Sequence, residues 1–172
     1  MKLIRTALTN LPRDIAIQTQ ALLRNAYRDD PEPEYNYGPQ LPDVVVLLLD
    51  GNFIAGHLAA YTRDVTIDTA PATIGLIGGV AVAETHRLQG HARAMVAEAH
   101  RYFVTRAIAF SVLFAASPAI YRSSGYRDMT NTTRFMDHDG TWKDLVYRDS
   151  MVAELANAHW PSRPLDLCGP TV

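Results

Sequence analysis

The stretch VAVAETHRLQGHARAMV, residues 80–96, decides the fold because it joins the end of an apolar strand to the start of an amphipathic helix. Arg87, Gly90 and Ala92 stand at the helix start, where strong helix formers are normally preferred. Beyond them, apolar residues recur at helical spacing and predict one buried helix face. The members of this face are Leu88, Ala92, Met95, Val96, Ala99 and Phe103.

The helix start has two interpretations. The first amides of a helix lack intrahelical acceptors and lie at the positive end of its dipole, so they can bind an anion. Gly90 and Ala92 would let that anion approach the backbone, and Arg87 adds a charge suited to phosphate. Alternatively, Gly90 is incidental and Arg87 is a solvated cap residue. The spacing alone favours neither interpretation.

Outward from this junction, the remaining patterns predict one α/β domain with a mixed sheet and the order β-α-loop-β-β-β-α-β-α-β-β. A Gly-Gly pair inside the strand before the junction, residues 78–79, indicates a bulge or a close backbone approach. Residues 64–73 are expected to be a connection. The other predicted elements are a strand over 2–8, a helix over about 13–27, a hairpin of 43–50 and 53–62, strands over 74–84 and 109–115, a short helix over 117–124 and a closing hairpin over 126–149.

The composition indicates an ordinary soluble globular protein. Of 172 residues, 48% are apolar and 20% are charged, which is enough to bury a core. The net charge of −2 predicts no general affinity for nucleic acid or for an anionic membrane. Cys168 is the only cysteine, which excludes an internal disulfide and fits a reducing compartment.

We therefore expect a cytoplasmic protein. The N-terminus has no apolar signal region, and the run VVVLLL is too short to span a bilayer. The sequence contains no G-x-x-x-x-G-K-[ST] motif and no H-E-x-x-H motif, and His86, His91 and His100 lack the spacing of a helical metal pair. No metal is expected.

A second stretch, SPAIYRSSGYRD over residues 117–128, carries a candidate catalytic residue. Tyr121 lies on the predicted short helix, and Gly125 ends that helix in a typical C-cap position. By itself, Tyr121 also fits a half-buried aromatic without a chemical role.

Together, the two stretches resemble the GCN5-related N-acetyltransferase (GNAT) superfamily. Val82, Arg87, Gly90 and Ala92 fill the places of its coenzyme A signature, and YRSSGY is similar to its Tyr-x-x-x-Gly-aromatic segment. The resemblance covers about residues 1–148, so residues 149–172 form a C-terminal extension of a single domain spanning 1–172. It implies a sheet whose central strands splay apart to admit the pantetheine arm of acetyl-CoA.

The resemblance also implies roles for individual residues. An N–H near Val80 or Ala81 would polarise the thioester carbonyl as an oxyanion hole does. The protonated Tyr121 phenol would act as the general acid on the leaving thiolate. The expected acetyl-CoA-binding residues are Val80, Ala81, Val82, Arg87, Leu88, Gln89, Gly90, His91 and Ala92.

The sequence departs from the family pattern in three places. Phe114 stands where many members carry an Asn, and Gly78 stands where some carry a Glu. Glu84 lies past the strand and is expected to be structural. His57 could serve as a base through water, or it is a hydrogen-bonded sheet histidine, so the base stays unassigned.

The loop after the first helix supplies candidate acceptor-binding residues. Glu32, Glu34, Tyr35 and Tyr37, with His57, would attract a cationic amine, although a solvated loop would look the same. The ending WPSRPLDLCGPTV resembles the C-termini of some aminoglycoside N-acetyltransferases and nodulation N-acyltransferases. This resemblance favours an amino sugar or a similar small amine.

The sequence therefore predicts transfer of an acetyl group from acetyl-CoA to a small primary amine, such as an amino sugar or a polyamine. Two alternatives stay open: a non-catalytic acyl-CoA-binding module, and a protein or peptide N-acetyltransferase. The expected partners are acyl-CoA and the amine, with no nucleic acid and no membrane. The tail and the closing hairpin are compatible with a homodimer.

Overall fold

The structure, a computed structural model, describes residues 1–28, 37, 40–137 and 139–172. The chain forms two compact units. Unit 1 comprises residues 1–61 and 77–99, and unit 2 comprises residues 62–76 and 100–172. Three elements contribute residues to both units: β3 (Phe53–Ile67), β4 (Ala70–Val82) and α2 (His91–Thr105).

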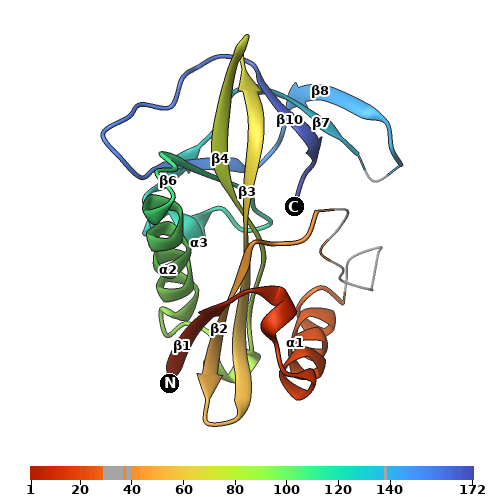
Figure 1. The fold of residues 1–172 in the computed structure, drawn as a ribbon, viewed down its shortest axis with the longest axis vertical. Coiled ribbons are helices and arrows are strands. Elements are labelled where there is room, and N and C mark those ends of the chain that lie inside the picture. Colours follow the sequence, from red (N-terminus) through yellow and green to blue (C-terminus); the bar gives the residue numbers. More distant parts are fainter. Residues whose placement is uncertain (29–36, 38–39, 138) are drawn as a thin grey trace. The chain divides into compact units, whose positions relative to one another are not determined.

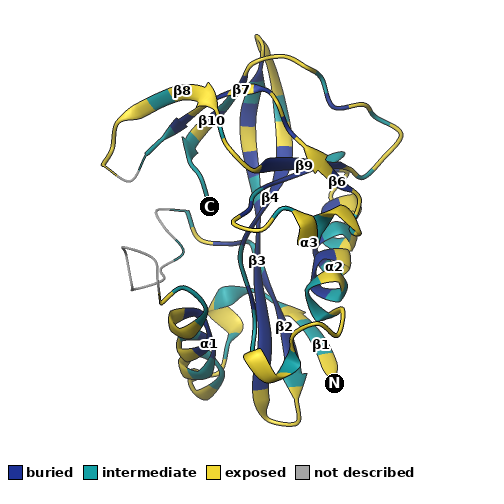
Figure 2. Cartoon of the chain, turned by 180° about the vertical axis from the view of Figure 1, so that it is seen from behind, coloured by how far each residue is buried: buried dark blue, intermediate teal, exposed yellow. Residues whose placement is uncertain are grey.

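Unit 1 is built on a central apolar strand, β2. This strand pairs antiparallel with β1 on one side and with β3 on the other (Figure 1). Its residues 45–48 are all buried, which is typical of a strand covered on both faces (Figure 2). The elements confined to unit 1 are β1 (Lys2–Thr6), the 3₁₀ turn η1 (Leu8–Asn10), α1 (Arg13–Ala26), β2 (Val44–Asp50) and the 3₁₀ turn η2 (Glu84–His86).

Helix α1 closes the core of unit 1. Pro12 stands at its N-cap, because proline is compatible with the start of a helix but not with its interior. The helix buries Leu22 and Leu23 and leaves its opposite face exposed (Figure 2). The core cluster that they join consists of Leu22, Leu23, Val45, Leu47, Ile54 and Ala81.

The predicted β2–β3 hairpin is confirmed. Asp50 pairs with Phe53, and Gly51 has a φ of +58°, which a glycine adopts without strain. The connection predicted over residues 64–73 is wrong, because β3 continues to Ile67 and β4 begins at Ala70. Val65 and Ile67 are buried while Asp64 is exposed, so this polar-looking segment has the alternation of a strand.

The apolar face of α2 is confirmed except at Leu88. Met95, Val96 and Ala99 are buried in the helix. Leu88 precedes the helix, has a φ of +62° and is fully exposed. The periodicity of the sequence continues through Leu88, but the left-handed backbone there breaks the helical geometry that would have placed it on the buried face.

Unit 2 contains a mixed sheet in the order β6-β9-β5-β4-β3-β10-β7-β8. The antiparallel pair of β7 and β8 confirms a hairpin in the predicted closing segment, although β6 stands apart from it. The elements confined to unit 2 are β5 (Phe110–Phe114), α3 (Ala119–Arg122), β6 (Tyr126–Asp128), β7 (Thr132–Met136), β8 (Trp142–Val146), β9 (Ser150–Glu154) and β10 (Leu165–Pro170).

The C-terminal segment supplies two inner strands of this sheet. Strand β9 pairs antiparallel with both β5 and β6. Strand β10 pairs antiparallel with β3 and parallel with β7. Residues 149–172 therefore belong to the core of unit 2, because Met151, Val152 and Leu167 are almost fully buried.

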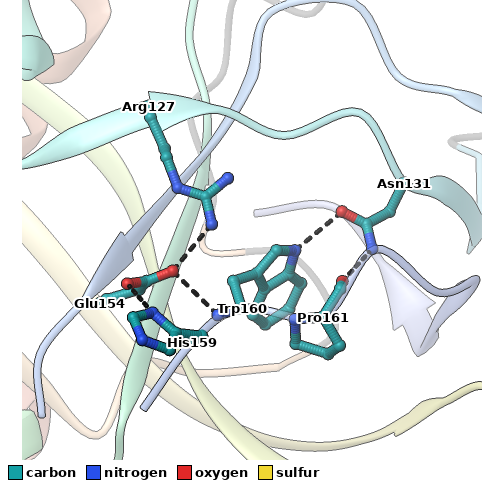
Figure 3. Close-up of polar contacts among 6 residues, drawn as sticks. All are labelled: Arg127, Asn131, Glu154, His159, Trp160 and Pro161. Atoms are coloured by element: carbon teal, nitrogen blue, oxygen red, sulfur yellow. Dashed lines mark hydrogen bonds and ion pairs between the residues drawn. The ribbon is translucent and has the colours of Figure 1, made fainter. Parts of the chain in front are cut away.

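The segment between β9 and β10 is held by a polar network (Figure 3). The Trp160 indole Nε1–H donates to Asn131 Oδ1 over 2.7 Å, and Asn131 Nδ2 donates to the Pro161 carbonyl over 2.8 Å. Glu154 accepts from Arg127 Nη2 over 2.8 Å and from the Trp160 backbone N–H over 2.9 Å. These bonds satisfy the polar atom of a buried indole and anchor the late Trp-Pro pair.

A mixed sheet flanked by helices confirms the predicted α/β class. Among the helices that the structure describes, none is long and apolar enough to cross a membrane.

Candidate active site

The junction between β4 and α2 lies wholly in unit 1. The sequence predicts that the strand runs directly into the helix, but η2 and five further residues lie between them. His86 holds this turn through its Nε2, 3.3 Å from Asp50 Oδ2, and through a stacked contact with the Phe53 ring. The Thr85 hydroxyl lies 2.8 Å from His86 Nδ1.

Two residues just before the helix have a left-handed backbone. Leu88 has a φ of +62° and Gly90 has a φ of +79°. A leucine in this region is uncommon, and such strain is often kept at functional sites. Left-handed residues also turn successive backbone N–H groups toward one side, which is how anion-binding nests form.

The backbone conformation explains why a glycine stands at position 90. A Cβ at this position would meet nothing within 4 Å, so packing does not require a glycine. The positive φ does require one, since a side chain there would be strained. The open space beside the backbone is also available to a ligand.

The start of α2 offers unpaired amides. The helical hydrogen bonds begin with the Ala94 N–H, which donates to the Gly90 carbonyl over 3.0 Å. The amides of His91, Ala92 and Arg93 precede it and have no acceptor within the helix. The first turn carries no acidic residue, so its positive partial charge is not offset locally.

The Arg87 side chain is held by the end of β4. Its Nε donates to the Val82 carbonyl over 3.1 Å. Among the described residues this is the only hydrogen bond of the Arg87 side chain, which leaves the Nη donors for a ligand. A guanidinium held in this way can bind phosphate through two parallel bonds. The neighbouring Gln89 side chain is engaged with the Thr85 carbonyl at 3.4 Å.

The end of β4 presents some backbone groups away from β3. The Ala83 N–H donates to Ala55 on β3 over 2.9 Å. N–H groups alternate between the two edges of a strand, so Ala81 also points toward β3, whereas Val80 and Val82 point away from it. Of the two expected thioester donors, Val80 therefore has its N–H on the edge away from β3, while Ala81 packs its side chain into the core cluster.

His57 lies on β3 and is completely buried. Its Nδ1 is 2.7 Å from the Gly79 carbonyl, and its Nε2 is 3.1 Å from the Tyr37 hydroxyl. Burial lowers the pKa of His57 to about 4 and raises the pKa of Tyr37 to about 12. Both side chains are neutral at pH 7. The interpretation of His57 as a hydrogen-bonded sheet histidine agrees with these contacts.

Three of the predicted acceptor-site residues lie outside the described residues: Glu32, Glu34 and Tyr35. Tyr37 is described, and it packs against the core cluster of unit 1. The sequence missed Tyr27, whose hydroxyl donates to the Val80 carbonyl over 3.3 Å. No local pattern could have revealed this contact, because 53 residues separate the two groups.

Tyr121 belongs to unit 2, on the one-turn helix α3. Its ring makes an edge-to-face contact with Tyr126, with 6.0 Å between the centroids. Burial raises the pKa of Tyr121 to about 12. The phenol therefore keeps its proton at neutral pH, and among the described residues its hydroxyl makes no hydrogen bond.

The Tyr126 ring is held in place by polar contacts of its hydroxyl. Its buried hydroxyl lies 2.6 Å from Ser111 Oγ and 3.0 Å from His100 Nε2. Burial raises the pKa of Tyr126 well above its usual value and lowers that of His100 to about 4. Tyr126 thus provides a rigid neutral surface for Tyr121.

The departures from the family pattern have structural correlates. Phe114 packs edge-to-face on Tyr147 at 4.8 Å, which is a packing role. Gly78 is buried within β4, and Glu84 is exposed on η2. None of these positions supplies a base. The described residues also contain no cluster of side chains that could hold a metal ion.

Residues 10–129 match the family model of the acetyltransferase (GNAT) domain. Both characteristic stretches lie within the matched region. No match was found among curated protein sequences.

Solved structures with a similar fold include several N-acetyltransferases. YhbS from Escherichia coli, in complex with CoA, has a TM-score of 0.67 at 18% identity, and the match covers 97% of this chain and 90% of that one. A GNAT family acetyltransferase from Brucella melitensis, in complex with acetyl-CoA, has a TM-score of 0.63 at 13% identity, with 95% and 94% covered. Eis1 from Mycobacterium abscessus has a TM-score of 0.60 at 19% identity; the match covers 77% of this chain, which spans only 33% of that one.

Proposed function

Since the chain belongs to the acetyltransferase (GNAT) family, we propose that it transfers an acetyl group from acetyl-CoA to the primary amine of a small cationic molecule. An amino sugar or a polyamine is the expected acceptor. The observation that carries this proposal is the β4–α2 junction, where left-handed Leu88 and Gly90 precede unpaired helix amides beside Arg87.

The junction fits the diphosphate of acetyl-CoA. The amides of residues 89–92 would hold its oxygens, because a helix start and a nest both favour an anion. The Nη donors of Arg87 would add a charge-assisted contact. The edge of β4 at Val80 and Val82 would pair with the pantetheine amides. Similar folds that hold CoA and acetyl-CoA support this assignment.

The proposed reaction is a direct attack within a ternary complex. The neutral amine forms the C–N bond while the Val80 N–H donates to the developing oxyanion. The C–S bond then breaks, and the Tyr121 hydroxyl gives its proton to the leaving thiolate. A free thiol, with an ordinary pKa near 8.5, is more acidic than Tyr121 at about 12, so solvent must reprotonate the Tyr121 phenolate for the step to go to completion. The amine proton passes to water, water returns a proton to Tyr121, and the base stays unassigned.

The acceptor is assigned from charge. The acidic segment with Glu32, Glu34 and Tyr35 precedes Tyr37, and carboxylates beside aromatic rings attract a cationic amine. Tyr37 and the buried His57 behind it would border this site. The late Trp-Pro and Gly-Pro pairs, shared with enzymes that act on amino sugars, agree with this acceptor class.

Release of free thiol from acetyl-CoA tests the proposal. The protein is mixed with acetyl-CoA and panels of amino sugars, polyamines and peptides, and the products are identified by mass spectrometry. The proposal expects an acetylated small amine in amounts equal to the released thiol. Acetylation of peptides alone would indicate a peptide N-acetyltransferase, and binding of acetyl-CoA without any product would indicate a non-catalytic module. Either result would overturn it.

A further inference from the structure

The peptide group between Gly79 and Val80 is held by a buried side chain. His57 Nδ1 lies 2.7 Å from the Gly79 carbonyl oxygen. This peptide is planar and trans, so its carbonyl and its N–H point in opposite directions. The carbonyl that His57 contacts and the Val80 N–H therefore cannot turn independently. Whatever fixes the Gly79 oxygen also fixes the direction of the Val80 N–H.

The hydrogen-bond pattern of His57 determines its tautomer. A carbonyl oxygen can only accept, so Nδ1 carries the proton and donates it to Gly79. Nε2 then carries the lone pair and accepts from the Tyr37 hydroxyl at 3.1 Å. Tyr37 thus selects the tautomer that points a donor at Gly79, as second-layer groups commonly do for histidine.

The same short segment is held from its other end as well. The Tyr27 hydroxyl donates to the Val80 carbonyl over 3.3 Å. Gly79 itself has a φ of +57°, a backbone state that glycine can also leave easily. Without a fixed partner, the peptide after Gly79 could rotate, so a bond that pins its carbonyl has a clear physical use.

We propose that His57 is a positioning residue, which directs the Val80 N–H toward the thioester carbonyl by holding the Gly79 carbonyl on the opposite side of the same peptide. The inference rests on the proposed function, in which Val80 supplies the oxyanion donor. The bond also polarises the peptide, because hydrogen bonds through one amide strengthen each other. His57 therefore acts through the backbone and needs no contact with either substrate.

This role differs from that of a general base. A base would need the Nε2 lone pair to face the amine, but that lone pair accepts from Tyr37. His57 is also completely buried, and its ring contacts Gly79 on β4 and Tyr37 rather than lying at a surface. The two hydrogen bonds of the ring explain a histidine at this position, and neither requires proton exchange.

Two amide substitutions separate the two ends of the imidazole. In His57→Asn, the side-chain nitrogen stands where Nδ1 stood, so the bond to Gly79 can be kept. In His57→Gln, the terminal amide stands where Nε2 stood, so the partner of Tyr37 is kept and the bond to Gly79 is lost. Both replacements are neutral, polar and buried, which makes each the control for the other.

The two variants should differ in turnover. Losing an oxyanion donor outright costs about 10²–10³ in kcat, so a misdirected donor in His57→Gln should lower kcat about 10- to 100-fold. The KM for acetyl-CoA should change by less than about 3-fold, because the other contacts of a bound substrate remain. His57→Asn should recover most of the wild-type kcat. Equal losses in both variants would overturn the proposal.

Nuclear magnetic resonance gives a second readout that does not depend on turnover. In the wild-type protein, a scalar coupling across the hydrogen bond should join His57 Nδ1 to the Gly79 carbonyl carbon. Addition of acetyl-CoA should shift the Val80 amide signal in the wild type and in His57→Asn, and not in His57→Gln. Absence of the coupling, or the same Val80 shift in all three proteins, would overturn the proposal, even if a variant folds poorly.

The two proposals fail in different ways. If the wild-type protein binds acetyl-CoA and acetylates no amine, the proposed function fails, while the Val80 signal still decides whether His57 directs this amide. If amines are acetylated and His57→Gln is as fast as His57→Asn, the proposed function stands and the positioning role fails.

Discussion

Replacing Gly90 with alanine tests whether the left-handed backbone before α2 seats a phosphate. Gly90 has a φ of +79°, and an added Cβ would meet nothing within 4 Å. The cost to folding therefore comes from the backbone alone, at about 1–2 kcal/mol for a side chain in the left-handed region. Alanine also lowers the conformational entropy of the unfolded chain, which offsets about 0.4–1 kcal/mol of this cost. The free energy of unfolding should fall by about 1.6 kcal/mol at most.

Gly51 provides a matched control in the same unit. Its φ is +58°, its added Cβ would also meet nothing within 4 Å, and it lies in the β2–β3 turn. Gly51→Ala should therefore lose about as much stability as Gly90→Ala. Any difference between the two variants in ligand binding then reports on the position and not on the loss of stability.

The expected effect of Gly90→Ala on CoA binding is larger. The new Cβ projects into the space where the diphosphate would approach, and the backbone is pushed away from its nest geometry. Hydrogen bonds to a charged group contribute about 1.5–3 kcal/mol each, so losing one should weaken CoA binding by about 10- to 150-fold. Pantetheine lacks the diphosphate, so its affinity should not change.

Titration calorimetry of wild type, Gly90→Ala and Gly51→Ala with CoA and with pantetheine gives the answer directly. The expected pattern is a loss confined to CoA and to Gly90→Ala. If Gly90→Ala binds CoA as tightly as Gly51→Ala does, or if pantetheine weakens equally, then Gly90 serves only the backbone turn and the reasoning is refuted.

Three further predictions concern unit 2. Tyr121→Phe should lower kcat about 10²-fold or more with little change in the KM for acetyl-CoA. Because burial raises the pKa of Tyr121 to about 12, wild-type turnover should show no decline from loss of this proton up to about pH 10. Unchanged turnover in the variant would remove Tyr121 as the acid. Gly75→Ala should lower the free energy of unfolding by about 1–3 kcal/mol, since its Cβ would lie 2.6–2.7 Å from the Phe103 ring. Adding Phe103→Leu should restore part of this loss, as measured by denaturant unfolding. If the losses of the two single variants simply add in the double variant, this explanation is contradicted. Hydrogen bonds from the Trp160 N–H and from Arg127 hold the pKa of Glu154 at about 2, so its contribution to stability is present above the usual carboxyl pKa and disappears as the pH falls toward 2. The melting-temperature gap between wild type and Glu154→Gln should accordingly narrow from pH 5 to pH 2, and a constant gap would contradict this assignment.

Patterns confined to a few neighbouring residues were predictable from the sequence. The continuous apolar run of β2, the Gly51 turn and the stripe from Met95 to Ala99 each carry their own signal, because burial and turn geometry act locally. The order of strands and helices up to α3 followed from these signals, whereas β9 and β10 were not predicted. For Gly90 the sequence left two interpretations open, and the φ of +79° adds that the backbone turn favours a glycine there.

Features that depend on distant pairing were not predictable. Val65 and Ile67 alternate as strand residues do, but their polar neighbours and the following proline resemble a loop until the β3–β4 pairing is known. Strand β9 is only five residues long, and its place between β5 and β6 depends on non-local registers. Leu88 keeps the helical period while its backbone is left-handed.

The same limit applies to the candidate site. The contact of His57 with Gly79 spans 22 residues and depends on how β3 and β4 are aligned, so the sequence left His57 between a base and a structural histidine. The Gly78-Gly79 pair was the one local signal for this contact, because it indicated an unusual backbone within a strand. The left-handed Gly79 agrees with that indication.

We propose that this chain moves an acetyl group directly from acetyl-CoA to a small amine, and a single-turnover experiment can test this. Excess protein is mixed with acetyl-labelled acetyl-CoA and an amino sugar or polyamine. We expect the label to pass to the amine without appearing on the protein, at a rate that falls in Gly90→Ala at subsaturating acetyl-CoA. Label that stays on acetyl-CoA with every small amine, or that first accumulates on the protein, would contradict it.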